Sequence, residues 1–193
     1  MNNSRHIQVW DPLVRIFHWS VAGCFIIAYL LEDEMLRLHL LMGSIVLGLV
    51  IFRLIWGVMG TEYSRFTDFA CSIRDINRHL HDLVRLRPAH HTGHTPVGGI
   101  MIFVLLAGLL MLCLSGVMLY ALENSSAPFA LLMSEATPGM ILVIENSHGL
   151  IADTLALLIV FHIAGAVLES VLQKENLIRA MVTGYKTERK ENL

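Results

Sequence analysis

The chain has 193 residues, of which 55% are hydrophobic and 16% are charged, and its mean hydropathy is +0.61. Soluble domains carry about a quarter charged residues, so this composition indicates a membrane protein. The formal net charge is -2, so no basic field favours nucleic acid as a partner, and the length suits a single domain over residues 1–193.

Four apolar stretches are long enough to cross a bilayer as helices, which takes about 20 mainly apolar residues each. In chain order, we expect spans at about residues 12–31, 38–59, 97–122 and 147–172. Asp11 followed by Pro12 is a typical helix start, with aspartate as N-cap and proline in the first helical position. The sequence therefore predicts an all-α, integral membrane four-helix bundle, with an inner loop at residues 60–95 and an outer loop at residues 123–146.

Both long loops contain apolar residues. In the inner loop, apolar residues at helical spacing between about Phe69 and Leu86 predict an amphipathic helix that lies on the membrane surface. The outer loop contains Pro128, Pro138 and apolar pieces that are too short to span, so we expect a structured lid or an interfacial segment there.

The basic residues are distributed very unevenly between the two sides of the membrane. With four crossings, both termini and the inner loop share one side, and of the 14 Lys and Arg residues all but Arg37 fall on it. Because Lys and Arg concentrate in cytoplasmic segments, we expect both termini to be cytoplasmic. A multi-pass protein of the bacterial inner membrane is the expected location.

The three cysteines, Cys24, Cys71 and Cys113, are far apart in the sequence. No C-x-x-C-H motif is present, which excludes the covalent attachment of a c-type haem. No C-x-x-C pair suggests zinc or an iron–sulfur cluster either. We interpret the three residues as small packing residues.

Histidine is frequent, and four of the ten histidines lie within or at the edge of the expected spans: His18, His39, His148 and His162. An ionisable side chain in a membrane helix is costly, so each is a candidate functional residue. His148 and His162 are separated by about four helical turns. They therefore share one face of the fourth helix and lie about 21 Å apart along its axis.

Depth in the membrane sorts these histidines into two pairs. The first span runs outward and the second runs inward, so His18 lies at the inner depth of His162, and His39 lies at the outer depth of His148. Each pair can supply both axial ligands of one haem iron, and the core of a helix bundle is where such sites are built. Two haems arranged in this way would form a path for electrons across the bilayer.

Other interpretations of the histidines are open. A bare zinc or di-iron site recruits carboxylates or thiolates, and the only acids near these depths are Asp153 and Glu169, towards the ends of the fourth helix. A chain of histidines that relays protons is a further alternative. For any single histidine, a hydrogen bond to the backbone of a neighbouring helix is a sufficient explanation.

Arg15 and Arg53, near the inner boundary, are candidates to pair with haem propionates, although they could also extend to lipid headgroups. Glycines within the spans leave room for a macrocycle, and close helix packing explains them equally well: Gly23, Gly43, Gly48, Gly108, Gly116 and Gly165. The inner-loop histidines are expected to be mostly solvated: His79, His81, His90, His91 and His94. For His94, a role in a quinone site or in binding a propionate is an alternative.

Several segments together resemble the bacterial cytochrome b561 family, which includes the cytochrome b subunits of nickel–iron hydrogenases. They are VWDPLVRIFHWS, LHLLMGSIVLGLVIFRLIWGVMG, GHTPVGG and HGLIADTLALLIVFHIAGAVLES, and they cover nearly the whole chain. The resemblance implies a four-helix bundle with two b haems, and it places the ligand positions at His18, His39, His148 and His162. Thr95 stands where the family usually has Asn.

The resemblance implies a di-haem protein that transfers electrons between the membrane quinone pool and an outer-face redox partner, such as a hydrogenase or a c-type cytochrome. It leaves open whether the chain is a subunit of an oxidoreductase or an enzyme in its own right. We expect the outer loop, residues 123–146, to select the partner. The acidic stretch Glu32–Glu34 could bind a basic redox partner, or it could be a solvated turn without such a role.

Two alternative functions remain. A stand-alone quinone reductase that oxidises superoxide, as in some members of the family, would favour a basic pocket on the outer face to steer the anion. Arg37 is the sole basic residue expected there, and acidic residues surround it. The other alternative is a haem-free membrane transport or structural subunit.

Overall fold

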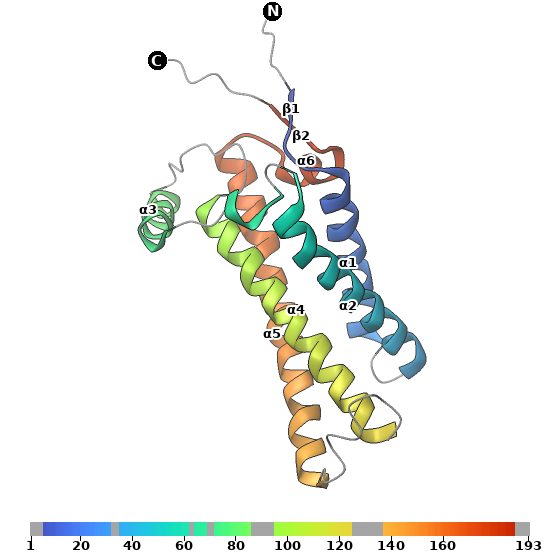
Figure 1. Cartoon of the computed structure of the whole chain (residues 1–193). Coiled ribbons are helices and arrows are strands. Elements are labelled where there is room, and N and C mark those ends of the chain that lie inside the picture. The colour runs from blue at the N-terminus through green and yellow to red at the C-terminus, as the bar shows by residue number, and fades with distance from the viewer. Residues whose placement is uncertain are drawn as a thin grey trace, which may run out of the picture. The chain divides into compact units, whose positions relative to one another are not determined.

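The computed structural model describes residues 6–31, 35–61, 64–68, 72–85, 95–124 and 137–187. Its four long helices are α1 (Pro12–Leu30), α2 (Leu36–Met59), α4 (Pro96–Asn124) and α5 (Pro138–Leu172), which Figure 1 shows along the chain. Each is long and apolar enough to cross a membrane. The expected all-α integral membrane protein with four spanning helices is thereby confirmed.

Five short elements complete the described part of the chain. They are the strands β1 (His6–Gln8) and β2 (Tyr185–Thr187), the 3-10 helix η1 (Phe66–Asp68), and the helices α3 (Ile73–Val84) and α6 (Leu177–Thr183). Helix α3 lies within the segment where the sequence predicts an amphipathic helix, and it is shorter at both ends. Its start is fixed by Ser72 and Asp75, whose side chains bond to each other and to each other's backbone N–H.

Helix α5 begins at Pro138, well before the span expected at residues 147–172, so the prediction of a loop over the whole of 123–146 is wrong in its second half. The physical reason is a start signal at Thr137 and Pro138. Proline suits the first helical position, and the N–H of Met140 donates to the Thr137 hydroxyl at 3.4 Å. The helix can therefore start ahead of Glu145 and Asn146, which interrupt the apolar run.

Asp11 fixes the start of α1, as the sequence predicts. Its Oδ1 accepts from the Val14 N–H at 3.0 Å, and its Oδ2 accepts from Trp56 Nε1 at 2.9 Å and from the Thr61 hydroxyl at 2.7 Å. Burial by itself raises the pKa of Asp11. The hydrogen bonds outweigh burial, so the pKa lies below the usual value of 3.8. One carboxylate thus caps α1 and ties it to the end of α2.

The chain divides into two compact units, and each long helix contributes a section to both. The terminal unit comprises Met1–Trp19, Phe52–Phe103 and Val160–Leu193, and the central unit comprises Ser20–Ile51 and Val104–Ile159. Each unit is described separately below, because each contains its own candidate site.

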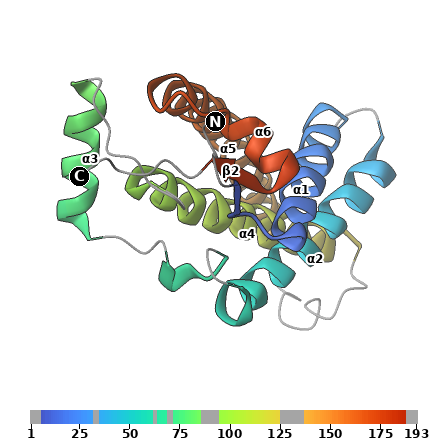
Figure 2. The ribbon, with the colours of Figure 1, turned by 90° about the horizontal axis from the view of Figure 1, so that it is seen from above.

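In the terminal unit, β1 and β2 pair antiparallel, with Ile7 opposite Lys186. Figures 1 and 2 both show β2 and α6 beside the start of α1. The carbonyl of Gly184 accepts from the N–H groups of Val9 and Trp10. Gly184 has φ 91, a conformation that side chains rarely adopt, and a Cβ there would lie 2.9 Å from the Trp10 carbonyl oxygen. Glycine is therefore required where α6 turns into the ribbon.

In the central unit, Val50 and Leu155 are fully buried. A Cβ on Gly108 would lie 2.7 Å from Leu155 Cδ2, so this glycine lets α4 and α5 approach closely. Large apolar side chains elsewhere on the long helices are exposed, Leu30 and Leu150 among them. Such exposure is costly in water and suits contact with lipid.

Candidate functional site

In the terminal unit, the structure brings His18 of α1 beside His162 of α5. Their ring centroids are 6.3 Å apart and their planes are inclined by 52°. The Trp19 ring meets His18 edge-on at 5.1 Å. His18 Nδ1 is buried and has no hydrogen-bond partner among the described residues. Buried polar atoms are normally hydrogen-bonded, so this nitrogen leaves room for a polar partner from outside the described residues.

In the central unit, the structure brings His39 of α2 beside His148 of α5, with ring centroids 6.1 Å apart and planes inclined by 69°. His39 Nδ1 lies 3.0 Å from the carbonyl oxygen of Ala28. A carbonyl only accepts, so Nδ1 carries the proton and Nε2 keeps its lone pair. This is the tautomer in which a histidine binds a metal through Nε2.

A hydroxyl sets the tautomer of His148 in the same way. The Ser115 hydroxyl donates to the carbonyl oxygen of Leu112 at 2.8 Å. Ser115 Oγ itself lies 2.9 Å from His148 Nδ1. Since the hydroxyl proton is used on Leu112, His148 Nδ1–H is the donor and Ser115 Oγ the acceptor. A Cβ on Gly116 would lie 3.0 Å from His148 Cε1, so this glycine packs directly against the imidazole.

The spacing of both pairs fits two imidazoles that bind one metal from opposite sides. A metal–nitrogen bond is about 2 Å, and the centre of an imidazole lies about 1.1 Å from its ring atoms, given ring bonds of about 1.35 Å. Two rings facing each other across one metal therefore have centroids about 6 Å apart. Within the described ranges, no group of three or more His, Cys, Asp or Glu could hold a metal ion. Each pair thus fits a metal whose remaining ligands come from a macrocycle.

The glycines of the spans fall into two kinds. Gly108 and Gly116 are accounted for by close packing against Leu155 and His148. For four others, an added Cβ would meet no heavy atom within 4 Å: Gly23, Gly43, Gly48 and Gly165. Open space beside a helix suits a group from outside the chain, which can be lipid or a macrocycle.

The two arginines both lie in the terminal unit. Arg15 donates from Nη1 to the carbonyl oxygen of Val182 at 2.8 Å. Arg53 is 3% exposed, donates from Nη2 to the carbonyl oxygen of Ser64 at 3.0 Å, and lies 4.9 Å from the centroid of the Phe66 ring. Arg15 Nε and Arg53 Nη1 are buried without a hydrogen-bond partner among the described residues. Their binding of haem propionates stays a prediction.

The expectation that the inner-loop histidines are mostly solvated is wrong for His79. Its Nε2 lies 3.3 Å from Glu169 Oε1, and its side chain is 2% exposed. The same carboxylate oxygen accepts from the Thr95 hydroxyl at 2.9 Å. His81 is exposed, as expected. The predictions for His90, His91, His94 and Glu32–Glu34 lie outside the described residues, as do those for residues 125–136.

A second carboxylate of α5 is also bonded to another helix. Asp153 Oδ1 accepts from the Tyr29 hydroxyl at 2.7 Å, within the central unit. The sequence located Asp153 near the depth of His148, but it gave no partner for it. The sequence likewise gave no partner for Ser115, Thr95 or Glu169, because bonds between distant helices leave no local sequence pattern.

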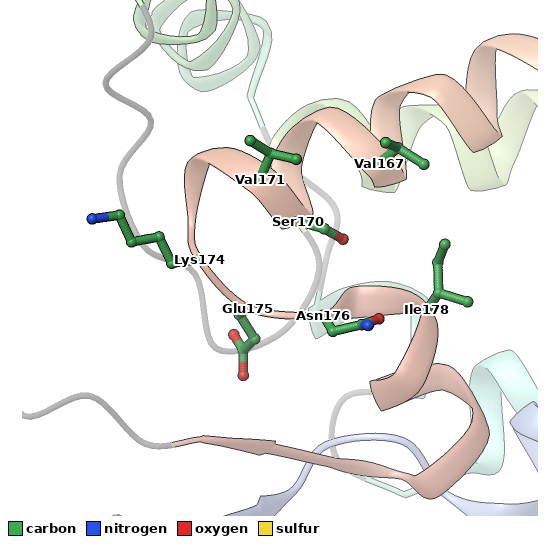
Figure 3. A pocket seen from close by; sticks show the side chains of 7 residues that line it. All are labelled: Val167, Ser170, Val171, Lys174, Glu175, Asn176 and Ile178. Carbon is green, nitrogen blue, oxygen red and sulfur yellow. The ribbon is translucent and has the colours of Figure 1, made fainter.

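An open cleft of about 390 Å³ lies where α5 ends and α6 begins (Figure 3). Its apolar wall comes from Val167, Val171 and Ile178. Two of its polar side chains have partners within the chain: Ser170 Oγ donates to Ala166 and accepts from the Leu177 N–H, and Asn176 caps α6 by accepting from the Arg179 N–H. Lys174 and Glu175 line it as well.

A family model described as prokaryotic cytochrome b561 matches residues 9–184. Those residues include all four paired histidines, both arginines, and Glu169 with its partners His79 and Thr95. No curated protein and no solved structure matches the chain.

Proposed function

The chain belongs to the prokaryotic cytochrome b561 family, and from this premise we propose that it is a di-haem protein linking the quinone pool to a redox partner on the outer face. Family membership and the four apolar helices make it a transmembrane b-type cytochrome that functions in electron transfer. The number of haems, the four ligands, the quinone, the outer partner and the inner membrane are our proposals.

The observation that carries the proposal is that two histidine pairs are present, each within one compact unit. The ring-centroid distances of 6.3 Å and 6.1 Å both suit one metal held between two imidazoles. Because α5 supplies one histidine to each pair, the two sites are linked by one continuous helix. This arrangement supports two haems rather than one.

In the central unit, neighbouring residues orient both histidines of the pair. The Ala28 carbonyl and the Ser115 hydroxyl accept hydrogen bonds from Nδ1–H of His39 and His148, so Nε2 of each ring would be available to bind the iron. A bound haem supplies one-electron transfer, at a potential set by its axial ligands and their hydrogen bonds. Arg15 and Arg53 supply the buried cationic groups that propionates would need in the terminal unit.

The direction of the path across the membrane rests on the basic residues. Their accumulation in the termini and in the inner loop supports a cytoplasmic location for the terminal unit. We therefore place the His18–His162 haem towards the cytoplasm and the His39–His148 haem towards the outer face. The outer loop, residues 123–146, is the segment that would select the outer partner.

The test is a redox difference spectrum of the purified protein, combined with the haem-to-protein ratio. We expect b-type absorption and two haems per chain. His162→Ala and His39→Ala should each remove one haem and spare the other, while His81→Ala, an exposed histidine of α3, should remove none. Absence of b-type absorption, or retention of both haems in His162→Ala, would contradict the proposal. A separate assay tests the link to quinone: a short-chain quinol is added, and its oxidation by the protein is measured.

A further inference from the structure

A cluster of buried polar side chains lies in the terminal unit, around the last turns of α5. His79, Thr95, Gln173 and Lys186 are between 3% and 7% exposed. They come from α3, from the residue before α4, from the end of α5 and from β2. Burying so many polar groups is costly unless they bond to one another.

Glu169 is the centre of this cluster. Its Oε1 lies 3.3 Å from His79 Nε2 and accepts from the Thr95 hydroxyl at 2.9 Å. Its side chain is 13% exposed, so the carboxylate is close to water without being fully solvated. A carboxylate and an imidazole in contact can share or exchange a proton near neutral pH.

The titratable groups around Glu169 are His79 of α3, in contact with its carboxylate, and Lys186 of β2, which interacts electrostatically with Glu169 and also with Glu175 of the turn between α5 and α6. Burial lowers the pKa of Lys186, while the carboxylates of Glu175 and Glu169 act in the opposite direction. The buried Lys186 therefore lies within electrostatic range of both carboxylates, and the buried His79 contacts one of them. In such surroundings, a change of charge nearby is felt more strongly than in water.

Glu169 also shares a face of α5 with His162. Two helical turns separate them, which places their backbones about 10 Å apart along the axis. Both belong to the terminal unit, so this separation is internal to it. At such a distance, in a medium less polarisable than water, one added charge shifts the protonation of a carboxylate.

We propose that the Glu169–His79 pair binds a proton when an electron reaches the His18–His162 site. One electron arriving there, supplied by a redox partner of the protein, is balanced by one proton taken up by the pair from water. On reoxidation, the electron leaves to the acceptor and the proton returns to water. The inference rests on the proposed function and adds to it a proton-exchanging site, next to the haem that we place towards the cytoplasm.

The test is a redox titration of the wild-type protein at several pH values, followed by the haem absorption. The component that His162→Ala removes identifies the His18–His162 site. We expect its midpoint potential to fall as pH rises, by up to about 59 mV per pH unit, because a tenfold change in proton concentration corresponds to 59 mV for one electron. Glu169→Gln should abolish this dependence while both haems remain bound.

A control variant, a replacement variant and one further measurement keep the outcome decisive. Asp153→Asn removes a carboxylate of the same helix that bonds to Tyr29 in the central unit, so it should leave the dependence unchanged. If Glu169→Gln does not fold, His79→Gln replaces it. In the wild type, the reduced-minus-oxidised infrared spectrum should contain a protonated-carboxyl band that Glu169→Gln removes.

A potential independent of pH, or an equal dependence in wild type and Glu169→Gln, would overturn the inference and leave the proposed function intact. A purified protein without b-type absorption would instead overturn the proposed function and this inference together. If Glu169 only anchors α3, its substitution would lower stability without changing the slope.

Discussion

Ser115 provides the sharpest test of how the protein controls one of its histidine pairs. The hydroxyl accepts from His148 Nδ1–H at 2.9 Å and donates to Leu112 at 2.8 Å, so it holds the imidazole in one tautomer. Donation from Nδ1–H makes a ligating imidazole more electron-rich, which favours the oxidised metal. Ser115→Ala removes this acceptor and should therefore raise the midpoint potential of the haem that we propose between His39 and His148.

The size of the shift follows from the strength of the hydrogen bond. A hydrogen bond of this kind contributes about 1 kcal/mol, and about 2.3 kcal/mol corresponds to 100 mV for one electron. If the whole of that energy distinguishes the two oxidation states, the potential rises by about 40 mV. The assay is a spectroscopic redox titration of wild type and variant, with the component assigned by its loss in His39→Ala.

Ser147→Ala is the matched control. Ser147 is the residue before His148, and its hydroxyl donates to the carbonyl of Val143 in its own helix. Its loss should leave both potentials within a few millivolts of wild type. The reasoning is refuted if Ser115→Ala keeps both haems and shifts neither potential, or if Ser147→Ala shifts the same component equally.

Three further substitutions test the fold, each by thermal unfolding in detergent. Lys174 has φ 51 just after the end of α5, where glycine is favoured, so Lys174→Gly should stabilise the protein by about 1 kcal/mol; a loss of stability would contradict this. Asp11→Asn should cost about 1–2 kcal/mol at pH 7. Because the folded pKa of Asp11 is depressed, the difference is fully present above pH 3.8 and should shrink as pH falls below that value; a constant difference would argue against the capping carboxylate. A Cβ at Gly57 would overlap the Phe66 ring, so Gly57→Ala should destabilise the terminal unit, whereas Gly23→Ala, which meets nothing within 4 Å, should not.

The four membrane helices were predictable from sequence because hydropathy and the helical period are local properties. The start of α5 was not, since Glu145 and Asn146 interrupt the apolar run and conceal the helix that Thr137 and Pro138 begin. Which histidines lie beside each other could be predicted from their depth in the membrane alone, because connectivity fixes the direction of each span. The binding of haem by these histidines stays a prediction that the variants above address.

Contacts between distant helices were beyond the sequence. Ser115 and His148 are separated by 33 positions, and His79 and Glu169 by 90. Whether such side chains meet depends on how far each helix is rotated about its axis, and the long helices are apolar on all sides, so their sequences do not specify that rotation. His79 was misjudged for a different reason: its own segment is polar, and nothing in that segment shows that the structure packs the side chain against a carboxylate of α5.

The position of α5 after the other three long helices has a consequence for biogenesis. Neither histidine pair exists until α5 has been synthesised, because it contributes one ring to each. Strand β1 likewise has no partner until Tyr185–Thr187 emerge from the ribosome. The two histidine pairs and the terminal ribbon can therefore be completed only after α5 and β2 have been synthesised. A chain stalled before α5 would be inserted in the membrane but would have no complete site to load.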